Sequence, residues 1–321
     1  MRRLAVLVAL VLVLGGCRVS GTPAIGGLRE IAVVTGWWGA VEPEVRAILQ
    51  REMLTPQPEP EFTLHVFSPD QFRGYSMFRT LLVIGTTQDT LVAALLGARA
   101  DSLPGGEYGL FRVPNPWAQN QELVIFAVRT DSLLVPGLRA YTARLRATFR
   151  EIAVRHVERA VYMRGRDAAA ERALARAHSF TIQVPKDWFL KQEHSAERFV
   201  YLFGHYPDRG VFVHWEDAPR ALAADSLVAL RDRLTAAFYR GDVVEPGYTA
   251  ADTAEFLSAP AVRLQGIWQN EKETTGGPFV SYSFNHEGRF FMVDGYVYNP
   301  GKKKLGALLE VEAVIRTFTP Q

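Results

Sequence analysis

The stretch that decides the fold is FVSYSFNHEGRFFMVDGYVY, residues 279–298. Its two parts, Phe279–Phe284 and Arg289–Tyr298, have the length and the aromatic and β-branched content of strands. The link between them, Asn285–Gly288, ends in a glycine, which supplies the positive φ that a tight hairpin turn needs. The sequence therefore predicts an antiparallel hairpin near the end of the chain, with a sheet built outward from it.

The residues around this hairpin complete a domain that we place at residues 178–321. Further strands are predicted where apolar residues alternate or run together, and helices where they recur at a spacing of three to four. Asp225 is expected to cap the first of the two helices. The predicted strands are Phe180–Val184, Phe199–Phe203, Val211–Trp215 and Val262–Trp268, and the predicted helices are Ser226–Phe238 and Leu305–Phe318.

The preceding residues, 30–177, are predicted to form a second domain of the same kind. Its last element is a long amphipathic helix that starts near Leu138 and continues past Gly165 to about Ala177. The other predicted elements are strands at Ile31–Val34, Phe62–Val66, Thr80–Ile84, Tyr108–Val113 and Leu123–Val128, and helices at Val41–Leu54 and Leu91–Ala98. The predicted fold class is α+β: two α/β-sandwich-like domains with mainly antiparallel sheets packed by helices.

The N-terminus has the pattern of a bacterial lipoprotein signal. Arg2 and Arg3 precede an apolar run, Leu4–Leu14, that is too short to span a membrane but fits a signal peptide. The run ends in Leu14-Gly-Gly-Cys17, which resembles a lipobox, and Cys17 is the only cysteine of the chain. We predict a signal peptide at residues 1–16 and a lipidated, flexible tether at 17–29. A plain signal peptide and twin-Arg export are the alternatives.

Composition excludes several classes of protein. The 36 Lys and Arg residues nearly balance the 34 acids, which excludes a typical nucleic-acid-binding protein. The single cysteine excludes a disulfide scaffold and any site with several thiolate ligands. Removal of the signal peptide takes away Arg2 and Arg3 and brings the net charge from +2 to zero. The absence of an acidic residue beside Cys17 favours the periplasmic face of the outer membrane.

Three C-terminal segments carry a resemblance to a known family. Gly276–Ser283, Asp294–Lys304 and Leu309–Ala313 resemble the signature of domain of unknown function 4837, a family of bacterial envelope lipoproteins. The resemblance is expected to cover nearly the whole chain, and it provides no catalytic residues. Ser179–Trp188 and Arg316–Phe318 also resemble parts of the α/β/α sandwich of Mog1 and PsbP proteins, which implies a non-catalytic adaptor or assembly module.

The side chains that could support catalysis do not form a recognised motif. No two of the seven histidines have the spacing of a helical zinc site, although His205 and His214 flank a predicted hairpin and could approach each other. Ser281 and Ser283 are expected to be structural residues of a solvent-facing or edge strand. A pair of carboxylates in a polar turn, Glu271–Glu273, would suit a glycosidase. No cofactor or metal is predicted, and an envelope hydrolase acting on glycan, peptide or lipid remains the alternative function.

Other features favour binding. Ten arginines stand against four acids between Arg139 and Arg176, and a lysine cluster precedes the last helix, where the helix dipole disfavours cations. Tryptophans in Gly- and Pro-rich loops suit a recognition surface. The candidate partner-binding residues are Trp37, Trp38, Trp117, Arg144, Arg155, Gly277, Phe279, Tyr298, Lys302, Lys303 and Lys304. We predict a non-catalytic binding or assembly module whose partner is the membrane, an anionic lipid or an envelope protein; a lipid carrier would need an apolar cavity. The oligomeric state stays open.

Overall fold

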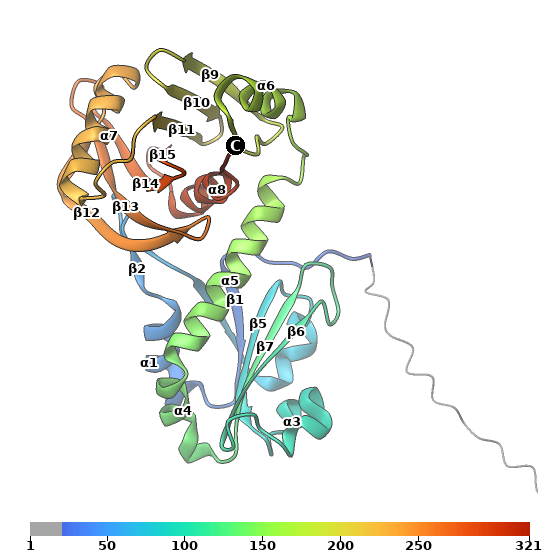
Figure 1. Ribbon diagram of the computed structural model, residues 1–321. Helices are drawn as coiled ribbons and strands as arrows, with labels where there is room; N and C mark the ends of the chain where they lie inside the picture. The colour runs from blue at the N-terminus through green and yellow to red at the C-terminus, as the bar shows by residue number, and fades with distance from the viewer. Residues whose placement is uncertain (1–20) are drawn as a thin grey trace, which may run out of the picture.

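The computed structural model describes residues 21–321, in two α+β domains (Figure 1). The predicted signal peptide, Cys17 and Arg18 lie outside the described residues. The α+β class is confirmed, and across the whole chain the sheets are mainly antiparallel. The two domains are joined by a long helix and by a short hairpin that extends from the first domain to the second.

The N-terminal domain is a five-stranded sheet in the order β4-β1-β5-β7-β6. Here the prediction of an antiparallel sheet is wrong, because β4, β1, β5 and β7 are parallel and only β6 is antiparallel. Helices cover both faces, so β5 and β7 are buried throughout and read as continuous apolar runs. The elements are β1 (Glu30–Val34), α1 (Trp38–Leu49), β2 (Glu52–Met53), β3 (Glu59–Pro60), β4 (Thr63–Phe67), α2 (Phe72–Tyr75), β5 (Thr80–Thr86), α3 (Thr90–Leu96), β6 (Tyr108–Pro114), β7 (Glu122–Val128), α4 (Leu134–Ala140) and α5 (Thr142–Val161).

Two hydrophobic cores hold this sheet. Apolar residues of α1, α4 and α5 pack on one face, and those of α3 pack on the other. Alternate residues of β1 show the division: Val33 belongs to the first core and Val34 to the second. The period of two along a strand thus sends each apolar neighbour to the opposite layer.

The C-terminal domain is a seven-stranded antiparallel sheet in the order β12-β13-β14-β15-β11-β10-β9. The hairpin predicted from residues 279–298 is confirmed as β14 and β15, with Asn285 paired to Phe290. Helices α6 and α8 cover one face and α7 covers the other. The elements are α6 (Ala168–His178), β8 (Phe180–Thr181), β9 (Trp188–His194), β10 (Phe199–Gly204), β11 (Asp208–Glu216), α7 (Ala224–Phe238), β12 (Val243–Phe256), β13 (Ala259–Asn270), β14 (Thr275–His286), β15 (Arg289–Tyr298), α8 (Leu305–Ile315) and β16 (Thr319–Pro320).

The two cores separate earlier than residue 178. The long helix α5 ends at Val161, and Gly165 has a φ of +94°, which breaks the predicted continuation. The next helix, α6, places Leu174 in the core of the C-terminal domain. Asp225 lies in the first turn of α7, whose N-cap position is occupied by Ala223.

The segment predicted as a flexible tether is held against the N-terminal domain from Thr22 onward. The backbone N–H of Gln119 donates to the carbonyl of Thr22 at 3.1 Å, and the N–H of Ala24 donates back to the carbonyl of Gln119 at 3.1 Å. Arg79 also donates to the carbonyls of Ala24 and Gly26. In Figure 1 the chain enters beside the loop between β6 and β7.

Candidate functional site

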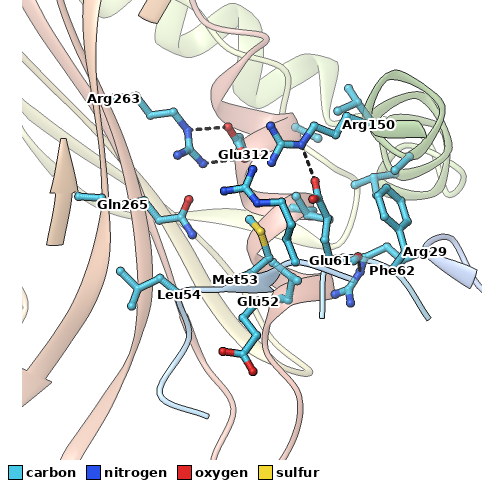
Figure 2. A pocket seen from close by; sticks show the side chains of 18 of the residues that line it. Arg29, Glu52, Met53, Leu54, Glu61, Phe62, Arg150, Arg263, Gln265 and Glu312 are labelled. Carbon is cyan, nitrogen blue, oxygen red and sulfur yellow. Dashed lines mark hydrogen bonds and ion pairs between the residues drawn. The ribbon is translucent and has the colours of Figure 1, made fainter. Parts of the chain in front are cut away.

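A cavity of about 610 Å³ lies where the two domains meet (Figure 2). Five parts of the chain surround it: Arg29 just before β1, the β2–β3 hairpin with the residues after it, and α5 from the N-terminal domain, and the β12–β13 sheet edge and α8 from the C-terminal domain. Its volume is in the range of small-molecule sites in proteins. The side chains labelled in Figure 2 are Arg29, Glu52, Met53, Leu54, Glu61, Phe62, Arg150, Arg263, Gln265 and Glu312.

The sheet wall of the cavity follows from strand register. Ala250 pairs with Gln265 and Asp252 pairs with Arg263, so these four residues alternate onto one face of β12 and β13. The residue between them, Leu264, turns to the opposite face and packs beneath α7. The wall therefore presents polar groups to the cavity while its reverse side is core.

A charged network around Glu312 crosses from the sheet to α8. The Glu312 carboxylate accepts a hydrogen bond from Arg263 Nε at 3.1 Å and from the Tyr282 hydroxyl at 2.5 Å. Arg316 Nη2 donates to the same hydroxyl at 3.0 Å. Burial opposes the ionisation of Glu312 most strongly, but Arg263, Tyr282 and Arg316 together outweigh it and lower the pKa of the carboxyl. Burial and the Glu312 charge raise the pKa of Tyr282 to about 12.

The hairpin wall is fixed by Arg29 and Arg150. Arg29 donates to the carbonyls of Pro60 and Glu61 at 2.8 and 3.0 Å. Arg150 on α5 pairs through Nε with the Glu61 carboxylate at 2.5 Å. These contacts hold the hairpin between the two domains, because its own two-residue strands are too short to be stable alone.

Glu59 links the hairpin to the other domain. Its carboxylate is 5% exposed and accepts hydrogen bonds from the backbone N–H groups of Lys304 and Leu305 at 2.6 and 3.1 Å. These are orphan donors at the start of α8, whose N-cap residue supplies no side-chain bond of its own. An acid from the N-terminal domain thus offsets the unfavourable placement of lysines at this helix start.

One lysine of the cluster, Lys304, is therefore bonded within the chain itself. Lys304 is buried and its Nζ donates to the carbonyl of Lys302, so Lys304 is not available to a partner in this structure. Lys302 and Lys303 remain exposed.

The remaining wall of the cavity is apolar. Its side chains are Met53 and Leu54 of the hairpin, Phe62, Val157 of α5 and Leu309 of α8. The described residues that line the cavity include no Ser, Thr, Cys, His or Lys. The Arg51 side chain is exposed and has no hydrogen-bond or ion-pair partner among residues 21–321. The cavity thus combines guanidinium groups with an apolar surface.

The predicted tryptophan surface is split between two places and is partly packed. Trp37 Nε1 donates to Asp89 at 2.8 Å, and Trp38 lies under the guanidinium of Arg46. Trp37 also lines a hollow of about 430 Å³ at the carboxyl ends of β1 and β5. After β1 the chain continues to β4 on one side of this pair, and after β5 it continues to β6 and β7 on the other, so the strand order reverses here. Trp117 belongs to the β6–β7 loop and packs edge-on against Phe72.

The arginines of α5 are largely paired inside the N-terminal domain. Arg155 donates to Glu122 at 2.6 Å, and Arg150 bonds Glu61 as described. Arg144 is exposed, with its guanidinium over the ring of Tyr141. The arginines that give this helix its positive charge therefore attach it mostly to its own sheet and hairpin, through ion pairs and hydrogen bonds.

Three predicted binding residues lie in the C-terminal sheet. Phe279 is fully buried beneath Arg231, so its assignment to a partner surface is wrong. Gly277 is also buried, where a Cβ atom would lie 1.9 Å from the carbonyl oxygen of Val297 on the next strand. Close approach of two backbones explains this glycine. Tyr298 is half-buried against Trp268.

The groups considered for catalysis are dispersed. Ser281 and Ser283 are fully buried in the central strand β14, which corrects their placement on an edge or solvent-facing strand. His214 pairs with Phe199 at one end of the β10–β11 hairpin, whereas His205 follows the other end, so these histidines do not approach. Glu273 lies 3.6 Å from Arg240.

The described part of the chain shows neither a metal-binding cluster nor a membrane-spanning helix. Residues 21–321 contain no group of three His, Cys, Asp or Glu side chains placed to hold a metal ion. None of the helices within this range has the length and apolarity required to cross a membrane.

Two family matches divide the chain. Residues 167–317 match the domain of unknown function DUF4837, and residues 24–162 match the domain of unknown function DUF8532. The first match confirms the resemblance carried by the C-terminal segments, although it covers that half and not nearly the whole chain. No curated protein matches the sequence.

Several solved structures resemble part of the chain. They include a protein of Bacteroides thetaiotaomicron (13% identity, TM-score 0.29, 45% of this chain and 46% of that one). Cyanobacterial PsbP of Synechocystis (10%, 0.33, 45% and 88%) and the Ran-binding protein Mog1p of Saccharomyces cerevisiae (7%, 0.32, 44% and 90%) are further ones. The chain spans less than half the length of the Bacteroides protein. Likenesses this remote carry no information on function.

Proposed function

We propose that this chain, whose residues 167–317 match the DUF4837 family, is a lipid-anchored envelope protein that binds a small amphipathic anion between its two domains without transforming it. The observation that carries the proposal is the interdomain cavity, in which guanidinium groups face an apolar wall. The lipobox at Cys17 is the sequence feature that supports the anchor and the periplasmic face of the outer membrane.

The arginines around the cavity leave one guanidinium for an anionic group, although Glu52 and Asp252 also line the cavity. Arg263 and Arg316 are occupied by Glu312, and Arg150 is occupied by Glu61. Arg51 is the guanidinium left without an internal partner, so it is assigned to the carboxylate, sulfate or phosphate of the ligand. The apolar portion of the ligand would lie along Met53, Leu54 and Leu309.

The chemistry of the lining supports binding over turnover. A hydrolase needs a nucleophile or an acid–base pair beside the substrate, with a proton available near neutral pH. Glu312 is held ionised by its three donors, which makes it a poor general acid. This favours the non-catalytic function over the envelope hydrolase.

The ligand is tested with a fluorescent probe, dansylundecanoate, on the purified chain. We expect saturable binding and displacement by dodecanoate, with dodecanol at least tenfold weaker because it offers Arg51 no charge. Arg51→Gln should weaken probe binding about fivefold to tenfold, as for the loss of one charge-assisted bond near the surface. Arg144→Gln, an exposed arginine outside the cavity, is the matched control.

Equal displacement by dodecanol and dodecanoate would contradict recognition of an anion. A similar loss of affinity in Arg144→Gln and Arg51→Gln would contradict the assigned site. The anchor is tested separately by mass spectrometry of the N-terminal peptide from membranes, with Cys17→Ser as the control. A wild-type peptide without acyl chains would refute the anchor.

A further inference from the structure

We propose that the surface around the entry of the N-terminal segment lies against the lipid headgroups, which fixes the orientation of the protein on its membrane. This surface, the tether face, consists of Ile25, Trp117, Arg159, Met163 and Arg164. The proposal rests on the proposed acylation of Cys17 and goes beyond it, because an anchor alone does not determine which side of a protein faces the bilayer.

The first step is the small number of residues between Cys17 and the first residue bonded to the domain. The backbone is fixed to the domain from Thr22, whose carbonyl accepts from the N–H of Gln119. From Cys17 to Thr22 there are five residue steps, which span at most about 18 Å when fully extended. A spacer that ran to residue 29, as the sequence predicts, would let the protein rotate freely on its anchor. A spacer that ends at Thr22 keeps Thr22 near the headgroups.

The second step is what surrounds Thr22. Gln119, which bonds Thr22 and Ala24, is followed by Asn120, whose side chain accepts from Arg159 Nη1 at 3.0 Å. Arg159 lies in the last turn of α5, so the exposed residues just beyond that helix, Met163 and Arg164, are its near neighbours. The end of α5 and the entry of the chain therefore belong to one surface.

The third step is the chemistry of that surface. Met163 is 80% exposed and Ile25 is 52% exposed, values that are unusual for large apolar side chains. Trp117 lies two residues before Gln119 in the β6–β7 loop. Apolar and tryptophan side chains beside arginines fit the boundary between the lipid headgroups and the acyl chains. The Trp117 ring and the Met163 thioether would enter this boundary, and the guanidinium groups would bind anionic lipid headgroups. Glu158 adjoins Arg159, and Asp167 lies three residues after Arg164. Met163 and Arg164 also line a hollow that contains Asp187 and Glu310 of the C-terminal domain.

The opposite end of the N-terminal domain provides an internal reference. The strands β1, β5 and β7 are parallel and begin at the end of the sheet where the chain enters, so their carboxyl ends point away from the tether face. Ser132 follows β7 at that far end and is exposed. A probe at residue 132 should therefore remain in water when the tether face is on the membrane.

The test uses the acylated full-length protein in vesicles of phosphatidylethanolamine and phosphatidylglycerol that contain doxyl-labelled lipid. Met163→Cys and Ser132→Cys are labelled with bimane; acylated Cys17 does not react. We expect quenching at residue 163 to exceed that at residue 132 at least threefold. Arg159→Gln combined with Arg164→Gln should reduce this difference when phosphatidylglycerol is present.

The outcomes separate the two proposals. Acylated protein with equal quenching at residues 163 and 132 overturns the orientation and leaves the proposed function intact. A Cys17 peptide without acyl chains overturns the anchor and the orientation with it. Bimane at Ile25→Cys gives a second position, so a folding defect of one variant does not decide the result.

Discussion

Replacement of Glu59 by alanine should loosen the junction between the domains without unfolding either of them. The carboxylate makes two hydrogen bonds, at 2.6 and 3.1 Å, to the first N–H groups of α8, and it is 5% exposed. Loss of a helix cap costs about 0.5–2 kcal/mol, and a charge favourably placed at a partly buried helix end contributes up to about 2 kcal/mol. Removal of a buried carboxylate also relieves its desolvation cost, which offsets part of the loss.

The balance is a destabilisation of the start of α8 by about 2 kcal/mol, or about a 30-fold change in a local opening constant. Hydrogen–deuterium exchange of peptides covering residues 299–309 measures it directly. Glu59→Ala should accelerate exchange of the Lys304 and Leu305 amides by about this factor. Glu59→Gln, which keeps one acceptor oxygen but no charge, should fall between alanine and wild type.

Glu52→Ala is the matched control, because Glu52 is an exposed acid on the same hairpin. It should leave the exchange of Lys304 and Leu305 unchanged. If Glu59→Ala exchanged these amides at the wild-type rate, the carboxylate would not cap α8 and the reasoning would be refuted. Equal acceleration over the whole C-terminal domain would point instead to global destabilisation.

Four further outcomes are expected. Arg231→Met should destabilise the C-terminal domain by about 3–5 kcal/mol in urea unfolding, because it leaves the fully buried Asp294 carboxylate without its 2.8 Å ion-pair partner. A double variant with Asp294→Leu should recover much of this loss of stability. Failure of the double variant to recover it would contradict this account. Burial raises the pKa of Asp242 to about 6, so the C-terminal domain should lose stability as pH rises from 4 to 6, and Asp242→Asn should abolish that slope. Burial, followed by the charge of Arg79, lowers the pKa of His156 to about 4, so the N-terminal domain should respond oppositely and lose stability as pH falls from 6.5 to 4, measured by domain-resolved hydrogen exchange; domains with parallel pH responses would contradict one of the two assignments. Gly277→Ala should unfold the C-terminal sheet or cost several kcal/mol, since the new Cβ would overlap a carbonyl of β15, and a normal melting temperature would rule out that clash.

Local patterns predicted the elements with strong apolar signals and missed those stabilised by their surroundings. The β14–β15 hairpin follows from its turn and its apolar strands. In contrast, β12 is an edge strand of mostly exposed residues, VVEPGYTAADTAEF. Its composition gives no strand signal, and its backbone pairing with β13 holds it in the sheet. The parallel order of the N-terminal sheet depends on crossover connections, which periodicity within one strand does not report.

The cavity is difficult to predict for a related reason. Its residues come from five separate parts of the chain. The ion pairs Arg150–Glu61 and Arg263–Glu312 join residues far apart in the sequence. One signal was present: cations at the start of α8 conflict with the helix dipole, which indicated a contact there. The acid that resolves the conflict, Glu59, stands in the Pro-rich segment that the sequence marked only as the end of a helix.

The contact between Glu59 and Lys304 joins positions 245 residues apart, and this distance has a consequence for how the protein is made. During synthesis the β2–β3 hairpin emerges long before α8 follows. The Glu59 carboxylate, which is buried in the folded protein, therefore stays in water until nearly all of the chain has been made. Closure of the cavity is therefore among the last events of folding, and a chain cut short before α8 would have two partly formed domains and no binding site between them.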